Sequence, residues 1–252
     1  VRHEKKANMV KEKILALLQE HPDIRVAELA KCLYVSEPTV RRDLTELDAA
    51  GLIHKVYGGA VLPDHADRSI PFVLRENEKS RAKAVMGRQA AELVSDGMVL
   101  LLDASTSAFH LIPYLSEKKE LIVVTSGAKT ALALAEAGIC TYSTGGRMLI
   151  HSYSYVGSQA ERFLADINAD LAFFSCRGLS DDGEISDSSV EEVNLRRVMI
   201  FRSRKSYLLC DGSKFGKTYF YTLCRADSLA GVISDRPLNR RTDDAPAGNP
   251  AE

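Results

Sequence analysis

The sequence has 252 residues, of which 45% are hydrophobic and 27% are charged, and its formal net charge at pH 7 is −1. This composition is that of a globular chain with room for two domains, and it excludes a strongly basic or acidic protein whose whole surface attracts a charged polymer. The longest apolar runs, such as "MVLLLDA", are too short to cross a bilayer. Five scattered cysteines without a CxxC pair favour reduced thiols, a cytoplasmic location and no metal site.

Three short helices and a hairpin are predicted at the start of the chain. Residues 4–20 carry apolar side chains at helical spacing, and "HPD" breaks the pattern. A second helix is expected over residues 26–33. Ser36 is expected to cap a third helix, in which Pro38 occupies the first turn, where its missing N–H costs little. The following segment "LIHKVYGGAVL" has two apolar runs around a Gly-Gly pair, which indicates a β-hairpin.

This order of elements predicts a winged helix-turn-helix domain over residues 1–62. The third helix is expected to bury Val40, Leu44 and Leu47, which turns Arg41 and Arg42 toward solvent or a DNA groove. A solvated face would carry the same arginines, so the prediction depends on the surrounding helix-turn-helix. Asp43 is expected to interact with the helix dipole or cap instead of DNA. The side chains predicted to contact DNA are Ser36, Pro38, Thr39, Arg41, Arg42, Thr45, Lys55 and Tyr57.

The remainder predicts an α/β domain. Residues 63–75 contain two prolines and are expected to form a linker, followed by one long helix from about residue 76 to 94. Up to residue 238, apolar strands alternate with helices, which indicates a Rossmann-like parallel sheet covered on both faces. The polar tail 239–252 is expected to be disordered. The predicted strands are 98–103, 121–126, 140–144, 169–176, 206–211 and 229–235, with a helix over 189–203.

Small hydroxyl residues and glycines follow several of these strands, in "DASTSA", "TSGA", "TGGR" and "DGSKFG", and a polar loop that begins "RGLSDDGE" is expected after strand 169–176. The carboxyl ends of parallel strands meet at one edge of the sheet, where ligands bind and where loop N–H groups can approach an anion. Arg147 and Lys214 could add positive charge, and Asp103 could accept hydrogen bonds from ligand hydroxyls. A phosphorylated polyol fits this mixture, whereas an edge with a purely structural role is the alternative.

The N-terminal segment "VAELAKCLYVSEPTVRRDLTELDAAGLIHKVYGGA" resembles the DeoR family of bacterial transcription regulators. The resemblance continues through "FVLRENEKSRAK", "LLDAST", "YVGSQAERFL" and "LLCDGSKFG", and it covers about residues 9–236. It implies a second domain similar to ribose-5-phosphate isomerase that senses phosphorylated sugars and does not catalyse. By position it implies an effector site made of Asp103, Ser105, Thr106, Ser107, Thr125, Ser126, Gly145, Gly146, Glu191 and Lys214, to which the loop argument adds Arg147.

The first loop departs from the family pattern. Ser105 stands where the family usually has glycine, Ser107 replaces a threonine, and Ser126 follows Thr125 where asparagine is usual. Because Ser105 adds a side chain at the tightest point of the expected cradle, the identity of the effector stays open. The Tyr-rich segment "HSYSYVG" at 151–157 has no assigned role.

The sequence therefore predicts a homo-oligomeric repressor of a sugar-metabolism operon that binds operator DNA and is relieved by a phosphorylated sugar. Two alternatives remain. One is an isomerase-type enzyme that uses Lys214, Asp103 and Glu191 for acid–base work, against which the fused helix-turn-helix argues. The other is a regulator whose second domain only oligomerises. No catalytic residue, metal or cofactor is predicted.

Overall fold

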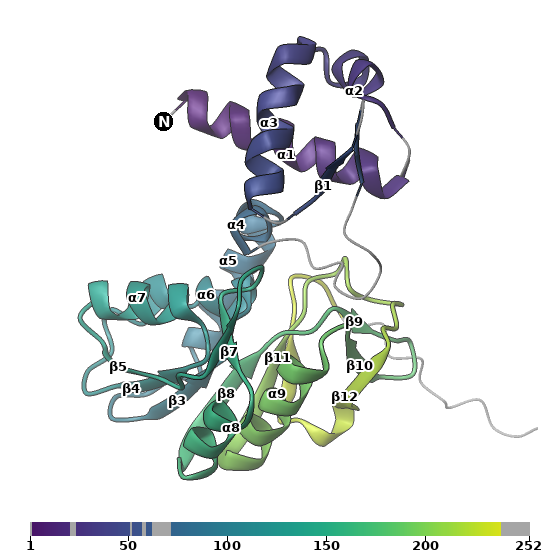
Figure 1. The fold of residues 1–252 in the computed structure, drawn as a ribbon. Helices are drawn as coiled ribbons and strands as arrows, with labels where there is room; N and C mark the ends of the chain where they lie inside the picture. The colour runs from purple at the N-terminus through teal and green to yellow at the C-terminus, as the bar shows by residue number, and fades with distance from the viewer. Residues whose placement is uncertain (1, 21–23, 51, 57–58, 62–71, 238–252) are drawn as a thin grey trace, which may run out of the picture.

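The computed structural model describes residues 2–20, 24–50, 52–56, 59–61 and 72–237. They form a small N-terminal domain and a larger α/β domain (Figure 1). Within these ranges, no helix combines the length and the apolar character that a membrane span requires.

The N-terminal domain is the predicted winged helix-turn-helix. Ser36 caps the third helix by accepting a hydrogen bond from the Thr39 N–H at 3.4 Å, and Tyr34 makes the turn before it in the left-handed region, with φ of 55°. The hairpin is antiparallel, with His54 opposite Val61. The elements are α1 (Arg2–Glu20), α2 (Val26–Leu33), α3 (Glu37–Ala49), β1 (His54–Val56) and β2 (Gly59–Val61).

A single apolar core holds this domain together. The predicted stripe of Val40, Leu44 and Leu47 is buried against α1 and α2, each side chain being at most 2% exposed. Burying one such side chain contributes about 1.5–3 kcal/mol, so a charge placed in this small core removes a large part of its stability. The other fully buried members are Ile14, Leu18, Leu29 and Ile53.

The α/β domain is built on a six-stranded, wholly parallel sheet, which confirms the predicted fold class. The strand order is β13-β11-β8-β3-β4-β5. Each predicted strand is present, although several are shorter than expected. The bounds are β3 (Val99–Leu102), β4 (Ile122–Thr125), β5 (Cys140–Ser143), β8 (Ala169–Phe174), β11 (Ser203–Leu209) and β13 (Gly231–Ile233).

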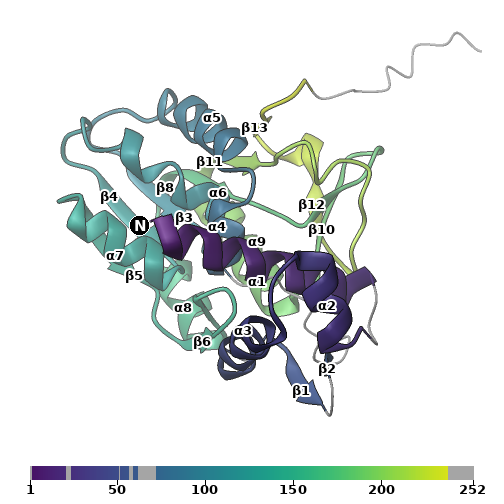
Figure 2. The ribbon, with the colours of Figure 1, turned by 90° about the horizontal axis from the view of Figure 1, so that it is seen from above.

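Helices cover both faces of this sheet (Figures 1 and 2). One apolar cluster lies between the sheet and α5 (Ser80–Ala91), α6 (Thr106–Phe109), the short helix η1 (Ile112–Tyr114) and α7 (Ala128–Glu136). The second lies between the sheet and α8 (Ser158–Ala165) and α9 (Val190–Arg202). The helix expected over 189–203 is α9.

The strand order creates a switch point between β3 and β8. From β3 the chain moves outward to β4 and β5, then returns to β8 on the other side of β3 and moves outward again to β11 and β13. The loops after β3 and β8 therefore leave toward opposite faces of the sheet. In open α/β sheets, this is the place where a crevice forms beyond the strand ends.

The start of the α/β domain differs from the expectation. Residues 72–75 belong to the short helix α4 (Phe72–Asn77), although they fall in the predicted linker. The single long helix expected from about residue 76 is broken between α4 and α5, where Lys79 has a φ of 51°.

Phe72 fixes α4 to the α/β domain. Its side chain is 1% exposed and packs edge-on against Phe109 and Tyr153, with ring centroids 5.5 and 6.2 Å away. Its N–H donates to the carbonyl of His151 at 2.7 Å. The unassigned segment 151–157 thus provides part of the docking surface for α4.

Two smaller strand groups were not predicted. One is the hairpin of β6 (Arg147–Leu149) and β7 (Ser154–Val156). The other is an antiparallel sheet in the order β12-β10-β9, formed largely by the segment expected to be a polar loop. Its strands are β9 (Gly178–Leu179), β10 (Glu184–Asp187) and β12 (Tyr221–Arg225), and the short helix η2 (Ala226–Ser228) follows.

Candidate functional site

The exposed face of α3 carries the two arginines of the N-terminal domain that were predicted to contact DNA. Their side chains are 61% and 67% exposed, on the side opposite Val40 and Leu44. Arg41 donates to Glu37 at 3.2 Å, and Arg42 lies 3.8 Å from Glu46. Such exposed pairs contribute little to stability, so both arginines can exchange partners at low cost.

The other predicted DNA contacts are distributed around this face. Ser36, Pro38 and Thr45 are exposed, and Thr39 is half-buried, with its hydroxyl 2.9 Å from that of Ser36. Lys55 belongs to β1, and Tyr57 lies outside the described residues. The roles of all eight residues stay predictions.

Asp43 is not at a helix end, contrary to the expectation. It follows Val40 by three residues, so it lies on the buried side of α3 and is only 1% exposed. Burial raises the pKa of its carboxyl above the ordinary value, although the nearby Arg42 and Lys11 oppose this shift.

The second candidate site lies at the switch point of the large sheet. Asp103, directly after β3, accepts hydrogen bonds from the N–H groups of Ser105 at 3.0 Å and Ser175 at 3.1 Å. Its carboxylate thereby ties the loop after β3 to the end of β8. Asp103 is 2% exposed and is an anchor of the loops, not an open acceptor for ligand hydroxyls as expected.

Arg196 on α9 reaches the same carboxylate from the other face of the sheet. Its guanidinium donates to Asp103 at 2.9 Å and to Asp187 at 2.8 Å, and it lies 3.8 Å from Glu192. Burial alone would lower the pKa of Arg196, but the three carboxylates outweigh burial and raise it. The buried guanidinium is therefore permanently charged and rigidly held.

Lys214, predicted from "DGSKFG", enters the site from the loop after β11. Its ammonium donates to the Ser175 hydroxyl at 2.6 Å and lies 3.7 Å from Asp211. The Ser175 hydroxyl donates onward to the carbonyl of Leu209 at 2.6 Å. Burial would raise the pKa of Asp211, but Lys214 and hydrogen bonds from Ser213 lower it below the ordinary value. The Asp211 carboxylate is therefore ionised at neutral pH.

These groups enclose a small cavity of about 30 Å³. This is room for roughly two water molecules, so a phosphorylated sugar can enter only if lining groups move. The Ser152 hydroxyl is buried and has no hydrogen-bond partner among the described residues. The lining residues are Arg75, Ser105, Thr106, Ser107, Ser152, Ser175, Cys176, Arg177, Asp187, Glu192, Arg196 and Lys214.

Positive charge exceeds negative charge among the lining side chains. Four are cations, Arg75, Arg177, Arg196 and Lys214, and two are carboxylates, Asp187 and Glu192. A fifth cation, Lys83 on α5, is buried behind Arg75 and donates to the Arg75 carbonyl. Burial, followed by Lys214 and Arg75, lowers the pKa of Lys83 to about 8. Crowded cations and hydroxyl groups of this kind suit an anionic ligand.

Cys176 contributes a thiol to the lining of the cavity. The adjacent Cys210 thiol and burial raise its pKa well above the ordinary value, so the thiol stays protonated at neutral pH. All five cysteines lie in the described part of the chain and are free thiols. Within the part of the chain that the structure describes, no group of three or more His, Cys, Asp or Glu side chains could hold a metal ion.

The predicted effector residues are only partly brought together. Ser105, Thr106, Ser107 and Lys214 line the cavity, and Asp103 supports it from behind. The other six are not among the lining residues. Four of them follow β4 or β5, on the side of β3 away from β8, and Arg147 and Glu191 lie on β6 and α9. These six, Thr125, Ser126, Gly145, Gly146, Arg147 and Glu191, stay predictions.

Several of these six have a visible structural role. Arg147 and Glu191 form an exposed ion pair between β6 and α9. Gly146 has a φ of 109°, and a Cβ atom there would lie 2.7 Å from the Val156 carbonyl, so the turn itself requires glycine. Thr125 accepts a hydrogen bond from the Gly127 N–H at 3.0 Å.

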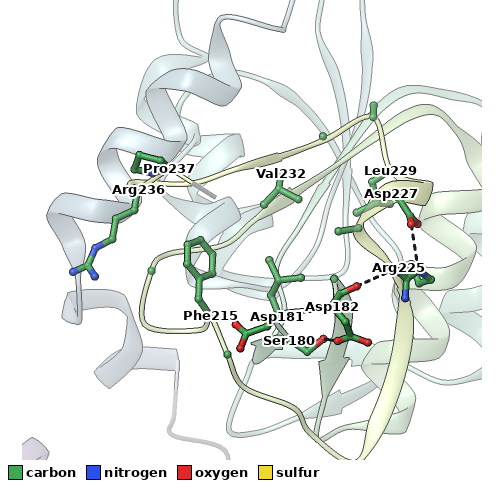
Figure 3. A pocket seen from close by; sticks show the side chains of 17 residues that line it. Ser180, Asp181, Asp182, Phe215, Arg225, Asp227, Leu229, Val232, Arg236 and Pro237 are labelled. Carbon is green, nitrogen blue, oxygen red and sulfur yellow. Dashed lines mark hydrogen bonds and ion pairs between the residues drawn. The ribbon is translucent and has the colours of Figure 1, made fainter. Parts of the chain in front are cut away.

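A larger groove of about 1200 Å³ lies between the β9-β10-β12 sheet and the β13 side of the large sheet (Figure 3). Its charged groups pair locally: Arg225 contacts Asp227 at 3.2 Å and the Asp182 carbonyl at 2.9 Å. Arg236 points away from the labelled acidic residues. We favour the smaller cavity as the ligand site, because its ionic groups are buried or half-buried and lie beside hydroxyl groups at the switch point, whereas those of the groove are exposed.

Two family models match the chain, one for each domain. Residues 11–66 match the DeoR-like helix-turn-helix domain, and residues 78–236 match the DeoR C terminal sensor domain. The chain belongs to the DeoR family.

Characterised relatives of this DeoR-family protein are named as transcription regulators. It is 32% identical over 90% of both chains to HTH-type transcriptional regulator GolR of Listeria innocua. It is 32% identical to the L-fucose operon activator of Haemophilus influenzae, over 90% of this chain and 91% of that protein. It is 28% identical to transcriptional repressor AccR of Agrobacterium fabrum, over 88% of this chain and 87% of that protein. These findings confirm a helix-turn-helix transcription regulator.

Among solved structures, ribose 5-phosphate isomerase A of Methanocaldococcus jannaschii matches the DeoR-family chain with a TM-score of 0.42 and 15% identity. The match covers 55% of each chain. A likeness of this size carries no argument about activity.

Eight lining residues of the cavity were missed from the sequence: Arg75, Ser152, Ser175, Cys176, Arg177, Asp187, Glu192 and Arg196. For Arg196 a signal was present. It falls three residues after Val193 and three before Met199, both buried, so it is a charged residue in the apolar stripe of α9. A charge in that position needs buried partners, which Asp103 and Asp187 supply.

Proposed function

We propose that the protein is a cytoplasmic repressor of a sugar-metabolism operon that binds operator DNA through α3 and leaves it when a phosphorylated sugar occupies the switch-point cavity. Paired DNA half-sites call for a homo-oligomer, because each helix-turn-helix reads one half-site. The relatives include both an activator and a repressor, so the sign of regulation belongs to the proposal.

The observation that carries the proposal is the cluster of cations around the cavity, of which Arg196 is buried and the others are half-buried. Arg75, Arg177, Arg196 and Lys214 meet there with four serines and a threonine. Gathering four cations away from water costs free energy, and the nearby carboxylates of Asp103, Asp187 and Asp211 offset part of that cost. A phosphate group would offset that cost by pairing with several cations at once.

The geometry gives little support to an isomerase-type enzyme. The Asp103 carboxylate is already engaged by Arg196 and two backbone N–H groups, so it is poorly placed to act as a base. Glu191 pairs with Arg147 at the surface. An acid–base pair facing the cavity is therefore missing from the three residues considered for that role.

The test is a thermal-shift screen of the purified protein with phosphorylated pentoses and hexoses, each beside its unphosphorylated sugar. A ligand at 100 times its Kd stabilises the folded state by about 2.7 kcal/mol, which shifts Tm by several degrees. We expect a phosphorylated sugar to raise Tm, to remain unconverted, and to weaken binding to an operator selected from random duplexes.

Lys214→Ala is expected to abolish the shift, and the exposed Lys205→Ala is the matched control. Conversion of the sugar would support the enzyme instead. The absence of any shift across the panel would support a second domain that only oligomerises.

A further inference from the structure

The cavity has one wall that belongs to neither the sheet nor its strand-end loops. Arg75 lies on α4, the first element of the α/β domain after the predicted linker. Its half-buried guanidinium is close enough to Arg177, Arg196, Asp187 and Glu192 for each of them to affect its pKa, which burial lowers. A charge carried by α4 is therefore part of the ligand cavity.

The segment facing α4 adds a second group. Ser152 is 2% exposed, lines the same cavity and has a hydroxyl without a hydrogen-bond partner among the described residues. A buried hydroxyl left unpaired costs about 1–3 kcal/mol, and a bound anion would recover that cost by accepting its hydrogen bond. Its neighbour His151 accepts the Phe72 N–H, so the hydroxyl and α4 share one contact region.

The size of the cavity connects this region to regulation. With about 30 Å³ available, even a phosphate group requires a wall to move. The strand-end loops are held by the Asp103 and Ser175 hydrogen bonds to the sheet, whereas α4 is a helix of six residues outside it. This wall, which is attached to α6, α7 and the 151–157 segment through Phe72 and Glu76 and not to the sheet, is also the wall nearest in sequence to the DNA-binding domain.

We propose that Arg75 and Ser152 contact the anionic group of the effector, and that Arg75 transmits its binding through α4 to the DNA-binding domain. The inference rests on the proposed function, because it assigns two residues and a route to the same site. It makes α4 an effector-contacting element and not part of a passive linker.

The test compares the full-length protein with its Arg75→Gln, Ser152→Ala and Arg81→Gln variants. Arg81 is an exposed arginine on the neighbouring α5 and serves as the matched control. Calorimetry measures the binding of inorganic phosphate and ribose 5-phosphate, together with any phosphorylated sugar that shifts Tm in the unaltered protein. Fluorescence anisotropy measures operator affinity with and without saturating amounts of the same compounds.

Arg75→Gln should weaken anion binding about tenfold or more, because it loses a charge-assisted contact. Ser152→Ala should weaken anion binding roughly fivefold, because it loses a neutral hydrogen bond. Operator affinity without anion should stay within about twofold of the unaltered protein. At saturating anion, Ser152→Ala should still release the operator, whereas Arg75→Gln should not. Arg81→Gln should match the unaltered protein in all measurements.

Normal anion binding and operator release by Arg75→Gln would overturn the inference while leaving the proposed function intact. No binding of any phosphate compound by the unaltered protein would instead remove the proposed function itself. If Arg75→Gln fails to fold, Arg75→Lys decides the matter, because it keeps the charge and loses the planar two-pronged donor. Equal anion affinity and operator release in Arg75→Lys and unaltered protein would then count against the inference.

Discussion

The guanidinium of Arg196 donates to the carboxylate of Asp103 at 2.9 Å, although the two residues are 93 positions apart in the sequence. Asp103 directly follows β3, and Arg196 comes from α9, which covers one face of the sheet. Because Asp187 holds the same guanidinium at 2.8 Å, contacts within the protein lock the strand ends and α9 together. Arg196 is thus held in place by protein groups, which lowers the cost of ordering it on ligand binding.

Asp103→Asn should destabilise the α/β domain. The substitution leaves Arg196 buried with one charged contact fewer, which should cost about 3 kcal/mol. Urea unfolding measures the loss. Arg147→Ala removes an exposed ion pair from the same domain and should leave the urea midpoint nearly unchanged. Equal midpoints for the two variants would mean that the Asp103 carboxylate does not hold Arg196.

Arg42→Ala should weaken operator binding without changing the fold. A base-contacting arginine contributes about 1–3 kcal/mol of specific binding, which is roughly 5- to 150-fold in affinity. Anisotropy at one fixed salt concentration gives the affinity. Arg204→Ala is the control, because Arg204 is also exposed but lies in the α/β domain, paired with Asp170 at 3.5 Å. An unchanged affinity in Arg42→Ala would exclude the contact.

Leu44→Asp should unfold the N-terminal domain. Leu44 is 2% exposed in a core of a dozen buried side chains, and a buried unpaired carboxylate costs several kcal/mol. Circular dichroism should show lost helix, and fluorescence anisotropy should show lost DNA binding. Thr45→Ala changes the adjacent exposed position and should keep full helicity. Full helicity in Leu44→Asp would show that this side of α3 is not buried.

Lys83→Met should stabilise the protein at neutral pH. The pKa of Lys83 is lowered from 10.5 to about 8, so keeping it charged at pH 7 costs roughly 3 kcal/mol. The expected gain is smaller, roughly 1–2 kcal/mol, because methionine leaves the Arg75 carbonyl without its donor.

The difference in unfolding free energy between Lys83→Met and the unaltered protein should change with pH. Between pH 8 and 10.5 the unfolded chain still binds the proton that the folded protein has released, so the stability of the unaltered protein rises with pH relative to Lys83→Met. The advantage of the variant should therefore shrink across this window, as measured by urea unfolding at several pH values. Lys217→Met, at an exposed position, should follow the unaltered protein. A constant difference would show that Lys83 has an ordinary pKa.

The helices and strands could be predicted because most of them follow a local pattern of apolar residues in the sequence. Runs such as "VLLL" at 99–102 are apolar throughout, as a strand covered on both faces requires, and the stripe of α3 repeats at helical spacing. The strands β9 and β10 escaped prediction because β9 has only two residues and β10 is polar, and because β12, which pairs with β10, lies far along the chain.

The site could be predicted only where it follows a strand end. Ser105, Thr106, Ser107 and Lys214 were found in this way. The strand order was not readable from the sequence, so the side of β3 on which the cavity forms was unknown. Arg196 and Arg75 come from helices, and only the folded chain brings them to that side.

The packing of Phe72 has a practical consequence for dividing the protein. The match to the sensor-domain family begins at residue 78, which suggests a fragment starting there. Such a fragment would omit α4, uncover the rings of Phe109 and Tyr153, and lack one of the four cations of the cavity. A fragment for crystallisation or ligand screening should therefore begin no later than Phe72. Ligand affinities obtained from the shorter piece would describe an incomplete receptor.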